Sequence, residues 1–231
     1  MAYTPDQAAK FSHPLVTAKG EDRASVRYGG TQTLWFNTGT LCNIECVNCY
    51  IESSPKNDRL VYLKVSDVTP YLDELDAAGE AGIEIGITGG EPFMAPEIIE
   101  IMSEILARGH HILMLTNAMQ PMMRPRIQAG LRDLRQAHGN AIIMRVSLDH
   151  YTAQMHDIER GHGSFAQTLT GLNWLAKHEF KVALAGRTMW DEAEADARRG
   201  YGKLIKDIGL EIDPDNPNEL VLFPEMQTDA D

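Results

Sequence analysis

The residues best suited to chemistry are three cysteines that lie within eight positions of one another. Cys42, Cys46 and Cys49 are the only cysteines among 231 residues, and their spacing is C-x3-C-x2-C. One disulfide would leave a thiol unpaired. The N-terminal segment has no basic stretch followed by an apolar run, so we expect no secretory signal. The three thiols therefore favour metal or redox chemistry over a disulfide.

Two kinds of metal site can use neighbouring thiols. A structural zinc site usually takes four protein ligands as two close pairs, but the chain has no second cysteine pair, and none of its eight histidines lies in the cysteine segment. A [4Fe–4S] cluster usually takes four thiolates, so three cysteines would leave one iron open to a substrate or cofactor. The spacing favours such a cluster, while zinc and inert thiols stay open as alternatives.

Alternating strand and helix patterns surround the cysteines and must position them. Runs that are nearly continuous in apolar residues, as in strands covered on both faces, predict strands at 32–37, 83–88, 111–116, 141–148, 181–187 and 219–223. Helical patterns occupy 69–79, 95–109, part of 122–137, 164–178 and 191–209. This alternation predicts parallel strands joined by crossover helices, either as an open doubly wound sheet or as an unclosed barrel, with ligands at the carboxyl ends of the strands.

Local signals predict where some helices begin. Thr69 is expected to cap the first helix, with Pro70 in its first turn, and Ser164 is expected to cap the fourth. The methionines of the segment 113–123 are expected to fill the core rather than to bind a cofactor.

The second predicted strand ends in the sequence TGGEP. Gly89 and Gly90 permit backbone geometries that are closed to other residues and let the main chain approach a ligand closely, and Pro92, after Glu91, helps to fix that shape. A tight strand-to-helix turn is the alternative interpretation.

Later strand ends supply polar side chains. Asn117 follows the third strand, and the period of two turns Ser147 and Asp149, which end the fourth, toward one face. Arg160 lies beyond them in HDIERGHGSF, and Arg187 ends the fifth strand. A turn or cap role for Asn117 and a surface salt bridge for Arg160 are equally open interpretations.

The three-cysteine loop after one strand and GGEP after the next resemble the signature of the radical S-adenosylmethionine (radical SAM) superfamily. The resemblance covers about residues 32–224. Within the superfamily, the chain is similar to members with SPASM or twitch-like C-terminal extensions. It implies a partial (β/α)6 TIM-like barrel in which Cys42, Cys46 and Cys49 hold a [4Fe–4S] cluster and the amino and carboxylate groups of SAM bind the open iron.

The resemblance also implies roles for the other candidate residues. The main chain of Gly89, Gly90 and Glu91, shaped by Pro92, would contact the amino group of SAM. Many members carry an aromatic residue before the third cysteine; here Asn48 stands there, which makes Tyr50 the candidate neighbour of SAM. Further contacts to SAM are expected from Asn117, Ser147, Asp149, Arg160 and Arg187. Arg187 could instead hold an anionic substrate. No catalytic residue is expected beyond the cluster ligands.

The implied activity is reductive cleavage of SAM to a 5′-deoxyadenosyl radical that abstracts hydrogen from a substrate. An electron donor such as flavodoxin or ferredoxin would supply the electron. Peptide modification and cofactor biosynthesis both stay open as substrate classes. The alternatives are a non-enzymatic zinc or iron–sulfur module and a catalytically incomplete remnant.

Composition and length complete the expectations. A net charge of −12 argues against a nucleic-acid-binding face, and the lack of a signal or a long apolar run predicts a cytoplasmic protein without membrane contact. Residues 1–30 are expected to be an N-terminal extension and residues 31–231 the radical SAM core. No closing helix is expected after the sixth strand, as in a chain that lacks its last helix and a C-terminal extension.

Overall fold

The computed structural model describes residues 11–188 and 191–224. The chain divides into two compact units, Met1–Thr31 and Gln32–Asp231. In the smaller unit, Val16 and Asp22 form an antiparallel bridge. Residues 1–10 of the predicted extension, and the predicted lack of a closing helix after residue 224, lie outside the described residues.

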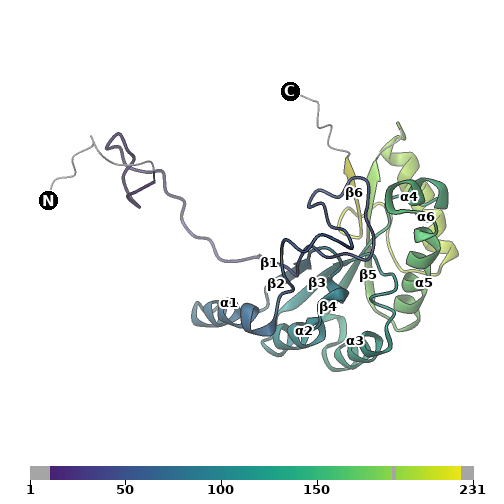
Figure 1. Ribbon diagram of the computed structural model, residues 1–231, viewed down its shortest axis with the longest axis horizontal. Coiled ribbons are helices and arrows are strands. Elements are labelled where there is room, and N and C mark those ends of the chain that lie inside the picture. Colours follow the sequence, from purple (N-terminus) through teal and green to yellow (C-terminus); the bar gives the residue numbers. More distant parts are fainter. Residues whose placement is uncertain (1–10, 189–190, 225–231) are drawn as a thin grey trace. The chain divides into compact units, whose positions relative to one another are not determined.

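Six parallel strands form one curled sheet whose strand order follows the chain (Figure 1). The strands are β1 (Thr33–Asn37), β2 (Glu84–Thr88), β3 (His111–Thr116), β4 (Ile142–Ser147), β5 (Lys181–Thr188) and β6 (Leu220–Pro224). A doubly wound sheet would reverse its strand order at a switch point, so the sequential order decides for the barrel-like alternative. The predicted partial barrel is confirmed.

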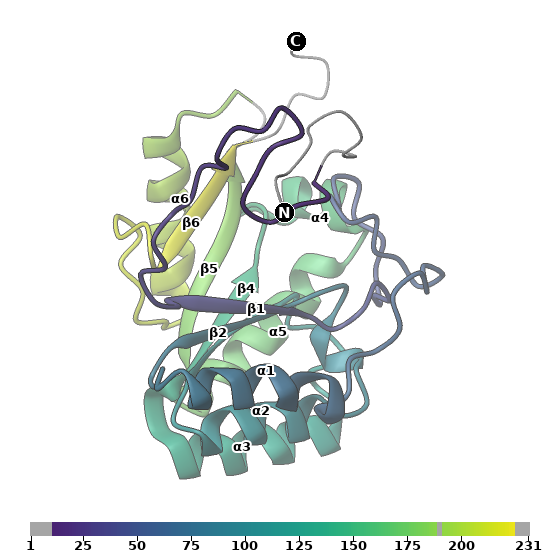
Figure 2. The same cartoon turned by 90° about the vertical axis from the view of Figure 1, so that its left-hand side faces the viewer.

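Helices cover one side of this sheet (Figure 2). They are α1 (Val65–Ala77), α2 (Ile98–Ala107), α3 (Pro125–His138), α4 (Ala153–Arg160), α5 (Ser164–Lys177) and α6 (Glu194–Asp207), with the 3-10 turns η2 (Pro92–Met94) and η3 (Gly139–Ala141). Every predicted strand and helix is present, with ends that differ by a few residues.

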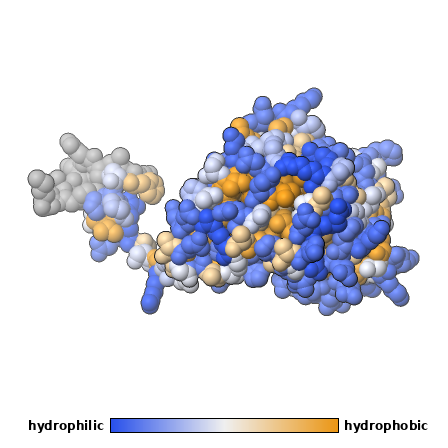
Figure 3. Space-filling view, turned by 90° about the horizontal axis from the view of Figure 1, so that it is seen from below, coloured by the Kyte–Doolittle hydropathy of each residue, from blue (hydrophilic) through white to orange (hydrophobic). Residues whose placement is uncertain are grey.

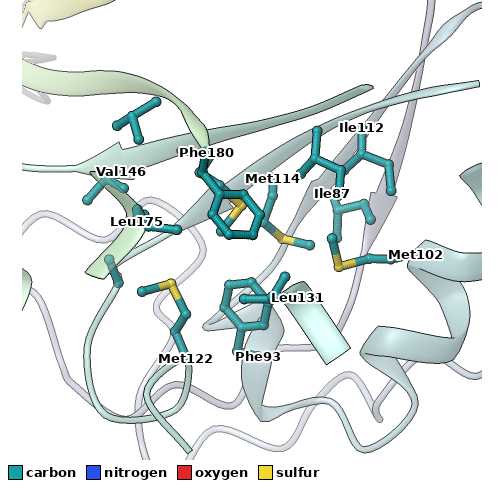
Figure 4. Packing of buried hydrophobic residues seen from close by; sticks show 14 of the residues in the cluster. Ile87, Phe93, Met102, Ile112, Met114, Met122, Leu131, Val146, Leu175 and Phe180 are labelled. Carbon is teal, nitrogen blue, oxygen red and sulfur yellow. The ribbon is translucent and has the colours of Figure 1, made fainter. Parts of the chain in front are cut away.

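The hydrophobic core lies between the sheet and the helices. Strand residues such as Ile87, Ile112 and Val146 pack there against helix residues such as Met102 and Leu175 (Figure 4). Burying this apolar surface is the main driving force for the fold. Met114 and Met122 are fully buried in this core, which confirms their predicted role.

The opposite face of the sheet, here called the inner face, is only partly covered. In β4, Ile142, Met144 and Val146 are buried on the helix side, while Ile143, Arg145 and Ser147 alternate with them and are partly exposed. The expectation that the strands are covered on both faces is therefore wrong for β4.

Two predicted helix starts are also wrong. The first helix begins at Val65, with Lys64 as its N-cap, so Pro70 lies inside the helix instead of in its first turn. Val68 and Leu72 are fully buried. Burial of this face offsets the backbone hydrogen bond that Pro70 cannot donate.

The start of α5 depends on a residue from another helix. Gly163, with a positive φ of 79°, is the N-cap, and Ser164 is already the first helical residue. Asp157, in α4, accepts hydrogen bonds from the backbone N–H groups of Gly163 and Phe165 at 2.7 and 2.9 Å. Helix α4 itself was not predicted, so its capping role was missed as well.

Candidate functional site

The three cysteines lie in the long connection between β1 and α1. Cys42 is buried, whereas Cys46 and Cys49 are partly exposed. The backbone N–H of Cys42 donates to the carbonyl oxygen of Ser54 at 3.1 Å, and the N–H of Ser53 donates to the Cys49 sulfur at 3.3 Å. The connection thus closes back on itself around the thiols.

The thiols are close enough to influence one another's protonation. Burial raises the pKa of the Cys42 thiol to about 12, and the charge of Cys46 adds to this rise. Burial likewise raises the pKa of Cys46, opposed by Arg160. Raised pKa values favour the protonated thiols of Cys42 and Cys46, so metal binding by these two residues must release their protons. Within the described residues, no three or more His, Cys, Asp or Glu side chains form a ready site for a metal ion.

The glycines of TGGEP are required by the cysteine loop. A Cβ atom at Gly90 would overlap the carbonyl group of Leu41, the residue before Cys42. The N–H of Gly90 donates to the Gly39 carbonyl at 2.8 Å, and the N–H of Glu91 donates to the Leu41 carbonyl at 3.1 Å. Gly90 is therefore needed for backbone packing within the chain, whatever ligand it also contacts.

The carboxylate of Glu91 joins the ends of β2 and β3. It is almost fully buried, and it accepts hydrogen bonds from the backbone N–H of Asn117 at 2.8 Å, the Thr116 hydroxyl at 2.9 Å and the N–H of Phe93 at 3.2 Å. Burial raises the pKa of this carboxyl, although the hydrogen bonds oppose the rise. Pro92, also buried, begins η2 directly afterwards.

Asn117 reaches the cysteine loop from the end of β3. Its side-chain nitrogen donates to Asn43 Oδ1 at 2.8 Å and lies 3.9 Å from the Cys42 sulfur. Its side-chain oxygen accepts from the N–H of Met119 at 3.0 Å. The turn role that the sequence left open and a position beside the cysteines are therefore both present.

A buried ion network occupies the ends of β4 and β5. Arg160 donates to both carboxylate oxygens of Asp149, at 2.8 and 2.9 Å, and Arg187 Nε lies 3.5 Å from the same carboxylate. Burial alone would raise the pKa of Asp149, but the two arginines outweigh it and hold that pKa below its usual value. The salt bridge considered for Arg160 is present, and it is buried instead of lying on the surface.

This network also holds the cysteine loop. Arg187 donates to the carbonyl oxygen of Asn48 at 3.0 Å. From the end of α4, the Glu159 carboxylate accepts from the Asn48 side chain at 3.0 Å, and the Glu159 carbonyl accepts from the N–H of Val47 at 2.9 Å. The segment between Cys46 and Cys49 is therefore fixed from two elements.

Two predicted residues stand apart from these contacts. Tyr50 is 80% exposed. Ser147 ends β4 on the inner face and is partly buried. Sequence reasoning missed Asn43 and Glu159. Of these two, only Glu159 had a usable signal: eight residues without a helix breaker lie between Thr152 and Gly161.

The model of the Radical SAM superfamily matches residues 36–196 of the chain. The chain belongs to this superfamily. The matched region contains the cysteine loop and every strand end from β1 to β5. Radical SAM proteins use a [4Fe–4S] cluster and SAM. Three cysteine thiols in one loop are the type of donor that such a cluster takes, although their sulfur atoms are not gathered into a ready metal site in the described residues.

The curated proteins that the chain matches are much longer than the chain itself. The antilisterial bacteriocin subtilosin biosynthesis protein AlbA of Bacillus subtilis is 33% identical over 155 residues, which cover 65% of this chain and 32% of AlbA. The mycofactocin maturase MftC of Mycobacterium ulcerans is 32% identical over 142 residues, covering 62% of this chain and 36% of MftC. The chain thus matches about a third of each relative.

Solved structures share the fold. Streptococcus suis SuiB bound to S-adenosylmethionine superimposes with a TM-score of 0.68 at 12% identity, covering 87% of this chain and 42% of SuiB. At this identity the likeness shows the fold alone.

Within the described residues, no helix combines the length and the apolar character needed to cross a bilayer.

Proposed function

We propose that the chain cleaves SAM reductively, with Cys42, Cys46 and Cys49 as the ligands of a [4Fe–4S] cluster. The supporting observation is that these three thiols share one loop whose backbone is hydrogen-bonded to the GGEP turn. When bound, the cluster supplies the electron that splits SAM into methionine and a 5′-deoxyadenosyl radical, which takes a hydrogen atom from the substrate. A flavodoxin or ferredoxin is the proposed source of that electron.

The residues around the loop have two kinds of proposed role. The main chain of Gly89, Gly90 and Glu91 is proposed to contact the amino group of SAM, with Pro92 fixing its shape. Because the carboxylate of Glu91 already accepts three hydrogen bonds, only its backbone is assigned this contact. Contacts from Tyr50, Asn117, Ser147 and Arg187 to SAM stay predictions.

Asp149 and Arg160 are proposed mainly as positioning residues. Their mutual hydrogen bonds occupy both carboxylate oxygens of Asp149 and two guanidinium nitrogens of Arg160. A direct contact from either residue to SAM stays a prediction. Arg187, which lies beside Asp149, and Glu159, which precedes Arg160, both hydrogen-bond to Asn48. These contacts hold the segment between Cys46 and Cys49 in place.

We propose a peptide as the substrate class. AlbA is named for the biosynthesis of the bacteriocin subtilosin, and SuiB has been solved with its precursor peptide SuiA. An AdoMet-dependent heme synthase of Methanosarcina barkeri, 29% identical over 143 residues, keeps cofactor biosynthesis as the second candidate. A cytoplasmic location stays a prediction.

The test is anaerobic reconstitution followed by SAM cleavage. We expect about four iron and four sulfide ions per chain, and methionine plus 5′-deoxyadenosine after addition of dithionite and SAM. Cys46→Ala should abolish cleavage while circular dichroism shows an unchanged fold, because Cys46 is not part of the hydrophobic core. Stoichiometric zinc in the anaerobic protein would support the metal-binding module, and a fully loaded cluster without product would support the remnant.

A further inference from the structure

Arg145 places a cation on the inner face of the sheet. It lies in the middle of β4, alternating with the buried residues Met144 and Val146. Its register neighbours on β3 and β5 are Leu115 and Ala183, so its strand neighbours on both sides are apolar. Such a position is costly for a charge unless a polar partner is present.

The surrounding inner face is mainly apolar. Trp35 and Gly86 are register neighbours on β1 and β2, and the indole ring of Trp35 lies where a Cβ of Gly86 would be. Leu113 and Ala183 are buried yet do not belong to the hydrophobic core on the helix side. By comparison, the side of the molecule that carries α1, α2 and α3, seen from below, is largely hydrophilic with apolar areas near its middle (Figure 3).

The guanidinium of Arg145 is incompletely partnered. One terminal nitrogen donates to the carbonyl oxygen of Asn218 at 3.3 Å, while Nε is buried and has no hydrogen-bond partner among the described residues. Burial lowers its pKa, and Glu84 is the counter-charge that opposes this effect. Glu84 forms no ion pair with Arg145 in the described part of the chain. An arginine remains charged in this setting, so the cation lacks a close anion.

We propose that Arg145 and the apolar inner face around it bind an acidic side chain of the peptide substrate. The planar fork of a guanidinium matches a carboxylate, which would supply the missing acceptors. The aliphatic part of a glutamate side chain would contact the apolar neighbours of Arg145. This inference rests on the proposed function, because it concerns the substrate of the same site.

The depth of Arg145 favours a side chain over a chain terminus. It lies two residues before Ser147 on the same face, which is about 7 Å below the carboxyl end of the strand. The guanidinium contacts the carbonyl oxygen of Asn218, two residues before β6 begins, so a peptide has to insert a long side chain such as glutamate through the mouth of the barrel to meet it. A terminal carboxylate could bind there only if the peptide end itself entered.

The test compares peptides that differ in one carboxylate. The cluster-loaded, SAM-bound full chain is titrated anaerobically in a calorimeter with acetyl-Gly-Ala-Glu-Ala-Gly-amide and with its glutamine counterpart. We expect the glutamate peptide to bind about tenfold tighter or more, because a charge-assisted pair replaces a neutral contact. Equal affinities, or no measurable binding of the glutamate peptide, would overturn the proposal.

Variants separate the Arg145 site from general charge effects. Arg145→Gln should remove the preference for glutamate, and Arg145→Lys should keep part of it because the charge remains without the fork. Arg126→Gln is the matched control; this arginine lies on α3, is 62% exposed and pairs with Glu100, so the preference should persist. A preference that survives in Arg145→Gln would overturn the assignment.

Two further arms keep the outcomes distinct. If the glutamine peptide with a free C-terminus binds as tightly as the glutamate peptide, a terminal carboxylate is the ligand and the side-chain assignment is wrong. Cleavage of SAM by the wild-type chain is measured separately without peptide. Cleavage without glutamate preference defeats only this inference, whereas a loaded chain that cannot cleave SAM defeats the proposed function.

Discussion

The two halves of the cysteine loop are held by different interactions. Around Cys42, the supporting contacts are made by uncharged groups. The backbone of Leu41 packs on Gly90, and the side-chain amide of Asn117 reaches the loop. Around Cys46 and Cys49, the supporting contacts come from the buried Asp149 ion network and from Glu159. The first half depends on close packing, and the second on charge compensation.

Two buried carboxylates show the same contrast in their titration. The pKa of Asp149 is held below its unfolded value of about 3.9, so its contribution to stability is present above that pH and is lost in stronger acid. The pKa of Glu91 is raised above its unfolded value of about 4.3, so its contribution declines as the pH rises from there through the folded pKa. The two halves of the site therefore respond to pH with opposite signs.

The largest expected effect is at Arg160. Arg160→Gln removes the bidentate partner of Asp149 and leaves a buried carboxylate under-compensated, which should cost about 3–5 kcal/mol of unfolding free energy at pH 8. Burial would then raise the pKa of Asp149, so the loss should shrink at pH 5. Urea denaturation of the cluster-free chain at both pH values measures this.

Arg126→Gln again serves as the control for that experiment. It breaks an ion pair whose side chains are 62% and 50% exposed, which should change the unfolding free energy by less than about 1 kcal/mol. If Arg160→Gln cost no more than this control, the Asp149 network would not be the support of the second half of the loop.

A smaller effect is expected at Gly90, in the packed half. Gly90→Ala places a methyl group against the Leu41 carbonyl, and the displacement should cost about 2–3 kcal/mol and weaken both iron retention and SAM binding. The measurements are urea denaturation, iron content after gel filtration and equilibrium dialysis with SAM. Unlike Arg160→Gln, this variant should show a loss that does not change between pH 5 and pH 8.

Gly79→Ala is the matched control for the methyl group. Gly79 has a φ of 71°, and an added Cβ would meet no atom within 4 Å, so only backbone strain of about 1 kcal/mol is expected, with full iron content. Equal costs at the two glycines would mean that contact with Leu41 is unimportant.

The smallest effect is expected at Glu91. In Glu91→Gln, the amide nitrogen would face one of the three hydrogen-bond donors, which destabilises the fold. Loss of the buried charge offsets part of this cost, so the unfolding free energy should fall by about 1 kcal/mol at pH 8. Only the wild type gains stability when the Glu91 carboxyl takes up a proton. The difference in unfolding free energy between the wild type and Glu91→Gln should therefore grow at pH 5. A difference that shrank in acid would contradict the raised pKa.

The local pattern of the chain was sufficient to predict the elements of the fold. The apolar runs and helical periodicities span about a dozen residues each, and they predict the six strands and five of the helices that the described residues form. They fail at α1, where they place Pro70 in the first turn of the helix, and at α4, whose eight residues carry a short pattern. Both errors concern helices whose limits depend on packing against the rest of the chain.

The sequence by itself determined the chemistry of the site: three thiols in one loop and a glycine turn after the next strand. Only the tertiary structure decided the partners of the remaining residues. Glu91 contacts Asn117 at a separation of 26 residues and Asn117 contacts Cys42 at 75, because curling of the sheet brings successive strand ends together. Residue type shows what a side chain can donate or accept, but the partner depends on which strand ends meet, and that is a property of the folded chain.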